Sequence, residues 1–129
     1  MVLKEPELFS YLKEFYYPDL AMSDDKFSKY DCISNDHKLY IELKSRNTHY
    51  PDLLIEKIKY DAIVEHASKL NYRPIYINST PEGIWMFDLL ISKPRDWIER
   101  WLPQNTEFSN RGNKTKVIGY LFTEQGLQL

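Results

Sequence analysis

Two stretches of the chain carry apolar residues at the spacing of an amphipathic helix. Residues 5–17 place five of them on one arc at 100° per residue, namely Leu8, Tyr11, Leu12, Phe15 and Tyr16. Residues 52–70 carry a second apolar arc, and Asp52 is suited to cap the first turn of that helix. The pattern therefore predicts two helices, one near residue 10 and one in the middle of the chain.

Short apolar runs around the second helix are typical of strands. The predicted elements are strands at 19–23, 29–34, 38–46, 73–79, 84–91 and 116–123, and a short helix that opens at Pro94 and carries Trp97, Ile98, Trp101 and Leu102. Polar turns join the strands into two hairpins, one before the middle helix and one after it. The predicted fold thus combines strands with helices in mixed order.

The strand over 38–46 alternates most regularly. Its apolar residues Leu39, Ile41 and Leu43 point to one face, because successive side chains of a strand point in opposite directions. Glu42 and Lys44 point to the other face. The alternation therefore places a carboxylate and an ammonium group side by side.

Composition narrows the class of protein. The chain has 129 residues, a net charge of −2 and 15% aromatic residues, which indicates a single folded domain over 1–129. No apolar run approaches the roughly 18 residues of a membrane helix, so we expect a cytoplasmic protein with no membrane partner. Cys32 is the single cysteine, which excludes an internal disulfide and a multi-cysteine zinc site. Any metal would therefore bind oxygen ligands.

Three residues form the strongest candidate site. Asp31 and Glu42 lie on adjacent predicted strands, where two carboxylates can hold a divalent metal, and Lys44 can orient or activate a water. An acidic residue two positions before a lysine occurs three times in the chain, but only Glu42 and Lys44 lie in a predicted strand with alternating apolar partners. The alternative interpretation is a solvated strand face with an ordinary cross-strand ion pair.

These residues also carry a resemblance. The runs Tyr-Asp31-Cys-Ile-Ser and Ile-Glu42-Leu-Lys44-Ser-Arg, followed by a helix and a strand, resemble the PD-(D/E)xK nuclease superfamily over residues 5–90. The resemblance implies an α/β (α+β), restriction-endonuclease-like fold. In it, a mixed sheet flanked by helices forms an αβββαβ core, here with an extra C-terminal hairpin strand, helix and strand. Tyr30 stands where the motif has its proline. Within the superfamily, the sequence is similar to archaeal-type Holliday-junction resolvases.

The resemblance implies a function and a set of roles. We expect a metal-dependent endonuclease that hydrolyses phosphodiester bonds in DNA, with Mg²⁺ as cofactor and Mn²⁺ as a substitute. Asp31 and Glu42 would bind the metal, with the Leu43 carbonyl as a third ligand and Lys44 acting on the water. Glu7 precedes Asp31 by 24 residues, about where such proteins place a helix glutamate of the metal shell. Glu14 is the competing candidate.

Other cations are candidates for catalysis and for contact with DNA. Lys59 interrupts the apolar arc of the second helix at a position where related nucleases carry Gln or Lys; alternatively, its stem packs while its head reaches water. Arg46 and a basic segment with Arg111, Lys114 and Lys116 could contact phosphates, although that segment could equally be a solvated loop.

The size of the chain indicates how many copies would act together on DNA. One small domain presents one active site, so cutting two strands would most simply use a homodimer or higher homo-oligomer on DNA. Two alternatives remain open: a catalytically silent nucleic-acid-binding or subunit-interaction protein, and, among enzymes, a Holliday-junction resolvase or homing-type endonuclease.

Overall fold

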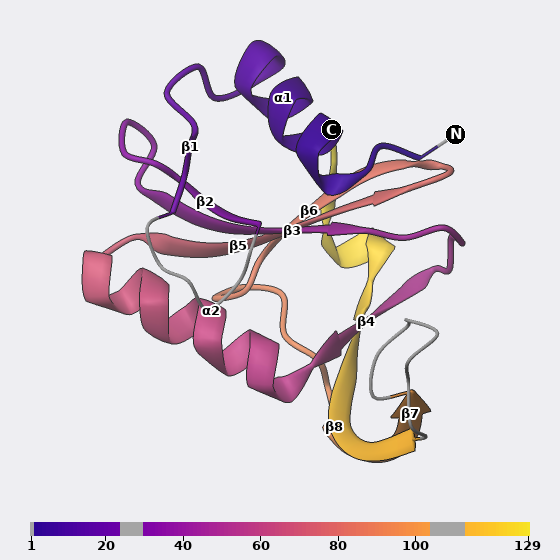
Figure 1. Cartoon of the computed structure of the whole chain (residues 1–129). Coiled ribbons are helices and arrows are strands. Elements are labelled where there is room, and N and C mark those ends of the chain that lie inside the picture. Colours follow the sequence, from indigo (N-terminus) through magenta and orange to yellow (C-terminus); the bar gives the residue numbers. More distant parts are fainter. Residues whose placement is uncertain (1, 24–29, 104–112) are drawn as a thin grey trace.

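The computed structural model describes residues 2–23, 30–103 and 113–129 (Figure 1). Its helices are α1 (Glu5–Phe15) and α2 (Lys57–Leu70), with a short 3-10 turn at Thr123–Gln125. Its strands are β1 (Ala21–Met22), β2 (Asp31–Ser34), β3 (Leu39–Ser45), β4 (Asp52–Glu56), β5 (Arg73–Thr80), β6 (Gly83–Asp88), β7 (Ile98–Pro103), β8 (Asn113–Phe122) and β9 (Leu127–Gln128).

A mixed sheet forms the centre of the fold. Its strand order is β1-β2-β3-β5-β6-β9, in which β3 and β5 pair parallel and the other neighbours pair antiparallel. Helix α1 covers one face of this sheet and α2 covers the other (Figure 1). The predicted mixed sheet flanked by helices is therefore confirmed.

The alternation of β3 sorts its side chains between two cores. Ile41 and Leu43 pack with Leu8 and Leu12 of α1, and Cys32 is buried in the same cluster. Tyr40 lies on the opposite face, in the cluster that includes residues of α2. Glu42 follows on that second face because it is two residues further along the strand. The core packing thus fixes which face carries the candidate chemistry.

The prediction of a helix over 52–70 is wrong for its first turn. Asp52–Glu56 forms strand β4, in which Leu53 and Ile55 are buried and the other three residues are only partly buried. That period of two is a strand pattern, and β4 pairs antiparallel with β8. Helix α2 begins at Lys57, so Asp52 does not cap it. Ile58, which belonged to the predicted apolar arc, is 67% exposed.

The short helix predicted from Pro94 is also wrong. Ile98–Pro103 forms strand β7, which pairs with β8 to give a second sheet in the order β4-β8-β7. Trp101, placed on the apolar face of that helix, is 69% exposed in the strand. The αβββαβ core consequently gains a fourth strand before α2, and a second sheet replaces the extra C-terminal helix in the described residues.

The remaining predicted elements are confirmed within a few residues. Helix α1 and strands β2, β3, β5, β6 and β8 occupy the expected stretches, and β1 reduces the edge strand expected over 19–23 to two residues. Neither helix in the described part of the chain has the length and apolar character that spanning a membrane requires.

Candidate active site

Two carboxylates face each other at the centre of the candidate site. Asp31 of β2 and Glu42 of β3 are directly opposed in the antiparallel ladder, so their side chains leave the same face of the sheet. Asp31 is 2% exposed and Glu42 is 7% exposed. Burying two acidic groups side by side is unfavourable unless cations or hydrogen bonds compensate them. The predicted pairing of these carboxylates on one face is therefore present, and it needs a positive partner.

The hydrogen bonding of Asp31 is uneven. The Tyr40 hydroxyl donates to its Oδ2 atom. Its Oδ1 atom is buried and has no hydrogen-bond partner among the described residues. A buried carboxylate oxygen without a partner fits a divalent cation, because such ions prefer oxygen ligands. The donor set thus suits Mg²⁺ or Mn²⁺, as the sequence predicts.

The two acidic residues do not complete a metal shell by themselves. Within residues 2–23, 30–103 and 113–129, no group of three or more His, Cys, Asp or Glu side chains is arranged to hold a metal ion. Backbone carbonyls, water or a phosphate oxygen would have to supply the other ligands. The Leu43 carbonyl, next to Glu42 in the chain, is the backbone group predicted for this role.

Two lysines approach the carboxylates from different elements. Lys59 of α2 places its Nζ atom 4.0 Å from Oε2 of Glu42. Lys44 projects from β3 on the same face as Glu42, as predicted, and its pKa is lowered first by desolvation and then by the nearby Arg46 guanidinium. The negative charges of Glu5 and Glu42 act in the opposite direction on this pKa. The structure thus brings both predicted lysines to one small cavity.

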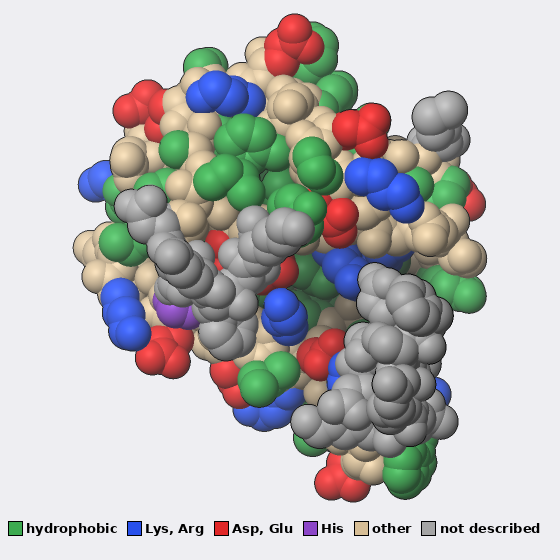
Figure 2. All heavy atoms as spheres, viewed as in Figure 1, with side chains coloured by type: hydrophobic (Ala, Val, Ile, Leu, Met, Phe, Trp, Pro, Cys, Tyr) green, Lys and Arg blue, Asp and Glu red, His purple; other side chains and the backbone are tan. Residues whose placement is uncertain are grey.

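That cavity has a volume of about 150 Å³ and lies where β3, β4, β5 and α2 meet. Its lining residues are Glu42, Lys44, Arg46, Leu54, Glu56, Lys59 and Tyr76. Acidic and basic side chains gather in the hollow beside β4 (Figure 2). Strand β4, which the sequence prediction missed, therefore forms one wall of the site.

Among the α1 glutamates, Glu5 rather than Glu7 or Glu14 makes a described hydrogen bond to β3. Glu7 accepts a hydrogen bond from the Lys4 backbone N–H at 3.0 Å, which caps its own helix, and its side chain is exposed. Glu14 is also exposed. Glu5, by contrast, accepts a hydrogen bond from the Ser45 backbone N–H at 3.0 Å, one residue beyond Lys44. Spacing in the sequence could not distinguish Glu5 from Glu7, because both lie in the first turn of α1.

Arg46, one residue after β3, lines the cavity and bonds to β4 and β5. Its Nε atom donates to Oδ1 of Asn78 at 2.6 Å, and its Nη2 atom donates to the Tyr76 hydroxyl at 3.2 Å and to the Leu54 carbonyl. These bonds use much of the donor capacity of the guanidinium inside the protein. The described contacts of Arg46 join the end of β3 to β4 and β5, and its predicted contact with DNA stays a prediction. Sequence patterns gave no signal for Tyr76 or Asn78, because both continue the buried run of β5.

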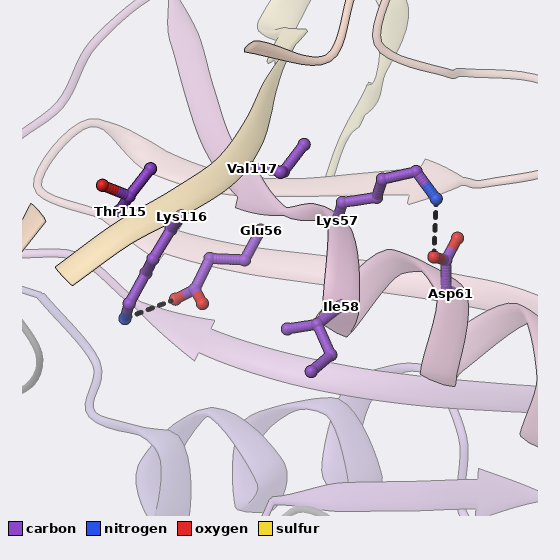
Figure 3. Close-up of a pocket in the computed structure, with 7 residues that line it drawn as sticks. All are labelled: Glu56, Lys57, Ile58, Asp61, Thr115, Lys116 and Val117. Carbon is purple, nitrogen blue, oxygen red and sulfur yellow. Dashed lines mark hydrogen bonds and ion pairs between the residues drawn. The ribbon is translucent and has the colours of Figure 1, made fainter. Parts of the chain in front are cut away.

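The predicted basic segment is only partly described. Lys116 lies in β8, where its Nζ atom is 3.4 Å from Oε2 of Glu56, and both line a larger cavity of about 610 Å³ (Figure 3). Arg111 and the side chain of Lys114 lie outside the described residues. Glu56 lines both cavities, so the larger one adjoins the carboxylate site.

The fold has a clear counterpart among solved structures. The chain is similar to Hjc, a Holliday junction resolvase from the archaeal hyperthermophile Archaeoglobus fulgidus, with a TM-score of 0.61 over 97% of this chain and 88% of that chain. The two chains thus have similar folds. At 14% sequence identity, the likeness to Hjc concerns the fold. It confirms the fold that the resemblance implies, a mixed sheet flanked by helices. No family model and no curated protein matches the sequence.

Proposed function

We propose that this chain is a single-domain, metal-dependent endonuclease that hydrolyses phosphodiester bonds in DNA. The observation that supports this proposal most strongly is the buried, directly opposed pair Asp31 and Glu42, in which Oδ1 of Asp31 has no hydrogen-bond partner among the described residues. Two lysines beside that pair supply the positive charge that a phosphate substrate requires.

Asp31 and Glu42 would hold the cation, which we propose to be Mg²⁺ with Mn²⁺ as a substitute. When bound, a divalent ion polarises the phosphate and lowers the pKa of a water molecule. The Leu43 carbonyl would be a further ligand. Of the α1 carboxylates, Glu5 is a better candidate for an additional metal ligand than Glu7. Glu5 contacts the backbone beside Lys44, whereas Glu7 caps the helix.

The lysines would have separate roles. Lys44 projects from β3 beside Glu42, where its ammonium group can orient the attacking water or stabilise the charge that develops on the phosphate. Lys59 comes from α2 and lies near Glu42, so it would hold that carboxylate in place and add positive charge at the entrance. A site built from a strand and a helix keeps both groups on rigid elements.

Branched DNA is the substrate class that the fold favours within this proposal. The neighbour of known structure is a Holliday junction resolvase. A chain with one candidate site would need a second copy to cut two strands symmetrically. We therefore propose a homodimer that acts on four-way junctions.

A cleavage panel tests the proposal. Purified protein is incubated with linear, nicked, flapped and four-way-junction DNA, and with matching RNA, in Mg²⁺ or Mn²⁺. We expect cleavage of junction DNA that depends on the metal and is abolished by Asp31→Asn. Asp36→Asn is the matched control, since Asp36 is exposed in the turn at the far end of β2, and it should cleave like wild type. Wild-type rates with Asp31→Asn, or no cleavage of any nucleic acid, would contradict the proposal.

A further inference from the structure

The contact between Tyr40 and Asp31 joins two buried side chains at the candidate metal centre. Tyr40 is 1% exposed and lies two residues before Glu42 on the same face of β3. Its hydroxyl donates a hydrogen bond to Oδ2 of Asp31, across the ladder between β3 and β2. The other oxygen of that carboxylate, Oδ1, is buried without a partner among the described residues. One oxygen is thus bound within the protein and the other is left for a ligand.

The Tyr40 ring is itself held in place. His66 of α2 stacks on it, with ring centroids 5.7 Å apart and an angle of 18° between the planes. The ring also packs in the buried cluster that contains Leu53 of β4 and Ile63 of α2. A tyrosine fixed on both sides cannot swing its hydroxyl away from Asp31 without disturbing the core. The packing of α2 against the Tyr40 ring therefore helps to fix the position of the hydroxyl that binds Asp31.

A carboxylate that is hydrogen-bonded through one oxygen has a fixed orientation and a restricted way of binding metal. Bidentate coordination uses both oxygens, and it would compete with the Tyr40 hydroxyl for Oδ2. Monodentate coordination through Oδ1 keeps that bond. Mg²⁺ demands a compact octahedral shell, whereas Ca²⁺ accepts bidentate carboxylates and irregular shells. The hydrogen bond from Tyr40 thus favours the geometry of the smaller ion.

We propose that Tyr40 is a positioning residue that orients Asp31 as a monodentate ligand and so favours Mg²⁺ over Ca²⁺ at this site. The inference rests on the proposed function, because it takes Asp31 as a metal ligand. Groups that hydrogen-bond to a ligand in this way typically change metal affinity by about 10- to 100-fold when they are removed. Tyr40 itself needs no contact with the metal, the substrate or the water.

The test measures metal binding without DNA, by titration calorimetry of the full chain with MgCl₂ and with CaCl₂. Tyr40→Phe removes the hydroxyl and keeps the ring. We expect it to weaken Mg²⁺ binding by about 10-fold or more and Ca²⁺ binding by less, so that the preference for Mg²⁺ falls. Tyr60→Phe is the matched control: the Tyr60 hydroxyl donates to the Leu89 carbonyl at 3.1 Å, and its loss should leave both affinities unchanged.

A second variant covers the case in which Tyr40→Phe does not fold, as judged by circular dichroism in EDTA. His66→Ala keeps the Tyr40 hydroxyl and removes the ring that supports it, so we expect a smaller loss of Mg²⁺ affinity in the same direction. Wild-type affinity for both ions in a folded Tyr40→Phe, or in His66→Ala where Tyr40→Phe is unfolded, would overturn the inference while leaving the metal site intact. Failure of wild-type protein to bind either ion would overturn the proposed function and this inference with it.

Discussion

The two faces of the six-stranded sheet differ in what they place beside the same strand. On the α1 face, Ile41 and Leu43 of β3 pack against Leu8 and Leu12, and none of these four side chains is more than 2% exposed. On the α2 face, β3 begins with the buried Tyr40 and continues to Glu42 and then to Lys44, which borders a cavity. One strand therefore serves a closed core on one side and a polar pocket on the other.

The two faces also differ in how their buried residues affect stability. An apolar pair in place of Asp31 and Glu42 would avoid burying two carboxylates, so their presence is unfavourable for the metal-free fold. Lys59 is 4.0 Å from Glu42 and offsets part of that cost. Functional sites commonly reduce stability in this way. Changes on the α2 face should thus affect activity first, and changes on the α1 face should affect stability first.

The largest effect is expected from Glu42→Gln, which removes one negative charge from the α2 face and keeps the shape of the side chain. We predict that single-turnover cleavage falls by about 1000-fold or more, because Glu42 is a proposed metal ligand. The free energy of unfolding measured in urea should change by less than about 1 kcal/mol, since a buried charge disappears along with its weak ion pair. Glu65→Gln, on the exposed side of α2, is the control and should change neither quantity.

Comparison of the two lysines distinguishes the roles of the strand and the helix. We predict that Lys44→Ala lowers the single-turnover rate by about 100-fold with little change in metal affinity, because the proposal has Lys44 act on the water or the phosphate. Lys59→Ala should lower the rate by about 10-fold, since the proposed role of Lys59 is to hold Glu42 in place. A normal rate for Lys44→Ala together with a severe loss for Lys59→Ala would assign the catalytic lysine to the helix.

On the α1 face we predict the reverse balance. Leu12 is fully buried against β3, so Leu12→Ala should lower the free energy of unfolding by about 2–5 kcal/mol. Cleavage under saturating conditions should stay near the wild-type rate at temperatures where the variant is folded. Phe15→Ala alters the same helix at a position that is 62% exposed, and it should cost less than about 1 kcal/mol. A large activity loss in folded Leu12→Ala would mean that the two faces are not independent.

The two faces of the sheet also show which features of the structure a local sequence pattern could predict. The alternation of β3 is local, so it predicted that Glu42 and Lys44 share a face and that Ile41 and Leu43 share the other. Strand β4 was missed because Ile55 fits both a helical arc and a strand alternation. Only its pairing with β8, more than sixty residues away, decides between them. Tertiary pairing of this kind overrides a local pattern.

The helix predicted where β7 lies was wrong for a related reason, and the choice among the α1 glutamates also depends on tertiary structure. Trp97, Ile98 and Trp101 have helical spacing, yet Ile98 pairs with Ile118 of β8, and that contact is invisible in a local window. Glu5 and Glu7 differ only in the side of α1 from which they project, and the position of α1 on the sheet settles which one reaches β3. The shared face of Asp31, Glu42 and Lys44 was therefore predictable, whereas strands β4 and β7 and the contact of Glu5 with β3 were not.

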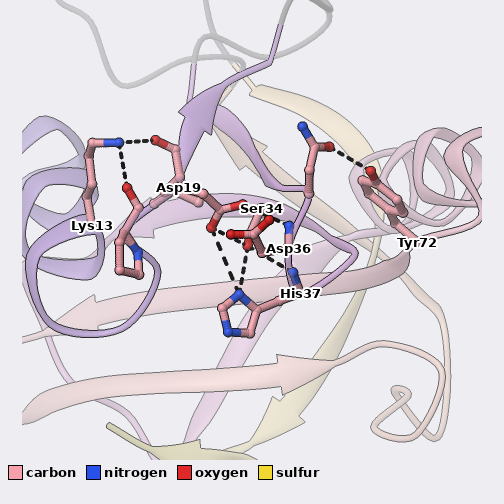
Figure 4. A network of polar contacts seen from close by, with 9 residues as sticks. Lys13, Asp19, Ser34, Asp36, His37 and Tyr72 are labelled. Atoms are coloured by element: carbon pink, nitrogen blue, oxygen red, sulfur yellow. Dashed lines mark hydrogen bonds and ion pairs between the residues drawn. The ribbon is translucent and has the colours of Figure 1, made fainter.

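A polar cluster at the other end of β2 from Asp31 combines residue types that are common in active sites. Asp19 accepts hydrogen bonds from the Ser34 hydroxyl and from the Asp36 backbone N–H, both at 2.8 Å, and His37 lies beside them (Figure 4). These bonds fix the segment before β1 to the β2–β3 turn, and the Asp36 N–H is the main cause that lowers the pKa of Asp19 below 3.8. The cluster serves the fold, although it combines Asp, Ser and His.

The lowered pKa of Asp19 determines how its contribution to stability depends on pH. Asp19 stabilises the fold at neutral pH, and this contribution is lost as the pH falls through the lowered pKa. We predict that Asp19→Asn lowers the unfolding midpoint at pH 7 by less than Leu12→Ala does, and that the difference from wild type shrinks as the pH falls from 5 to 3. Thermal unfolding of Asp19→Asn and of wild type, measured at several pH values in that range, tests this prediction. Cleavage by Asp19→Asn that falls as far as with Glu42→Gln would show that the cluster belongs to the site.

The smallest effect concerns the rim of the α2 face, where Lys116 and Glu56 form a partly exposed ion pair. A lysine that contacts a DNA phosphate contributes about 0.9 to the slope of log affinity against log salt. Lys116→Ser should therefore flatten that slope by at most about 0.9, and by less where Glu56 already competes for the ammonium group. Replacing Arg111 and Lys114 as well should raise the change to at most about three units, with saturating cleavage rates nearly unchanged.

Lys69→Ser supplies a matched control for this last measurement, because Lys69 also pairs with a glutamate, Glu65, at 3.4 Å, but at the far end of α2 from the carboxylate site. Fluorescence anisotropy with junction DNA at several salt concentrations gives both slopes. A reduced slope for Lys116→Ser with an unchanged slope for Lys69→Ser places the DNA along the β8 side of the site. Equal slopes for both variants and wild type would make Lys116 a structural partner of Glu56 alone. The DNA would then have to reach Asp31 and Glu42 from another side, such as that of Lys59, which lies beside Glu42.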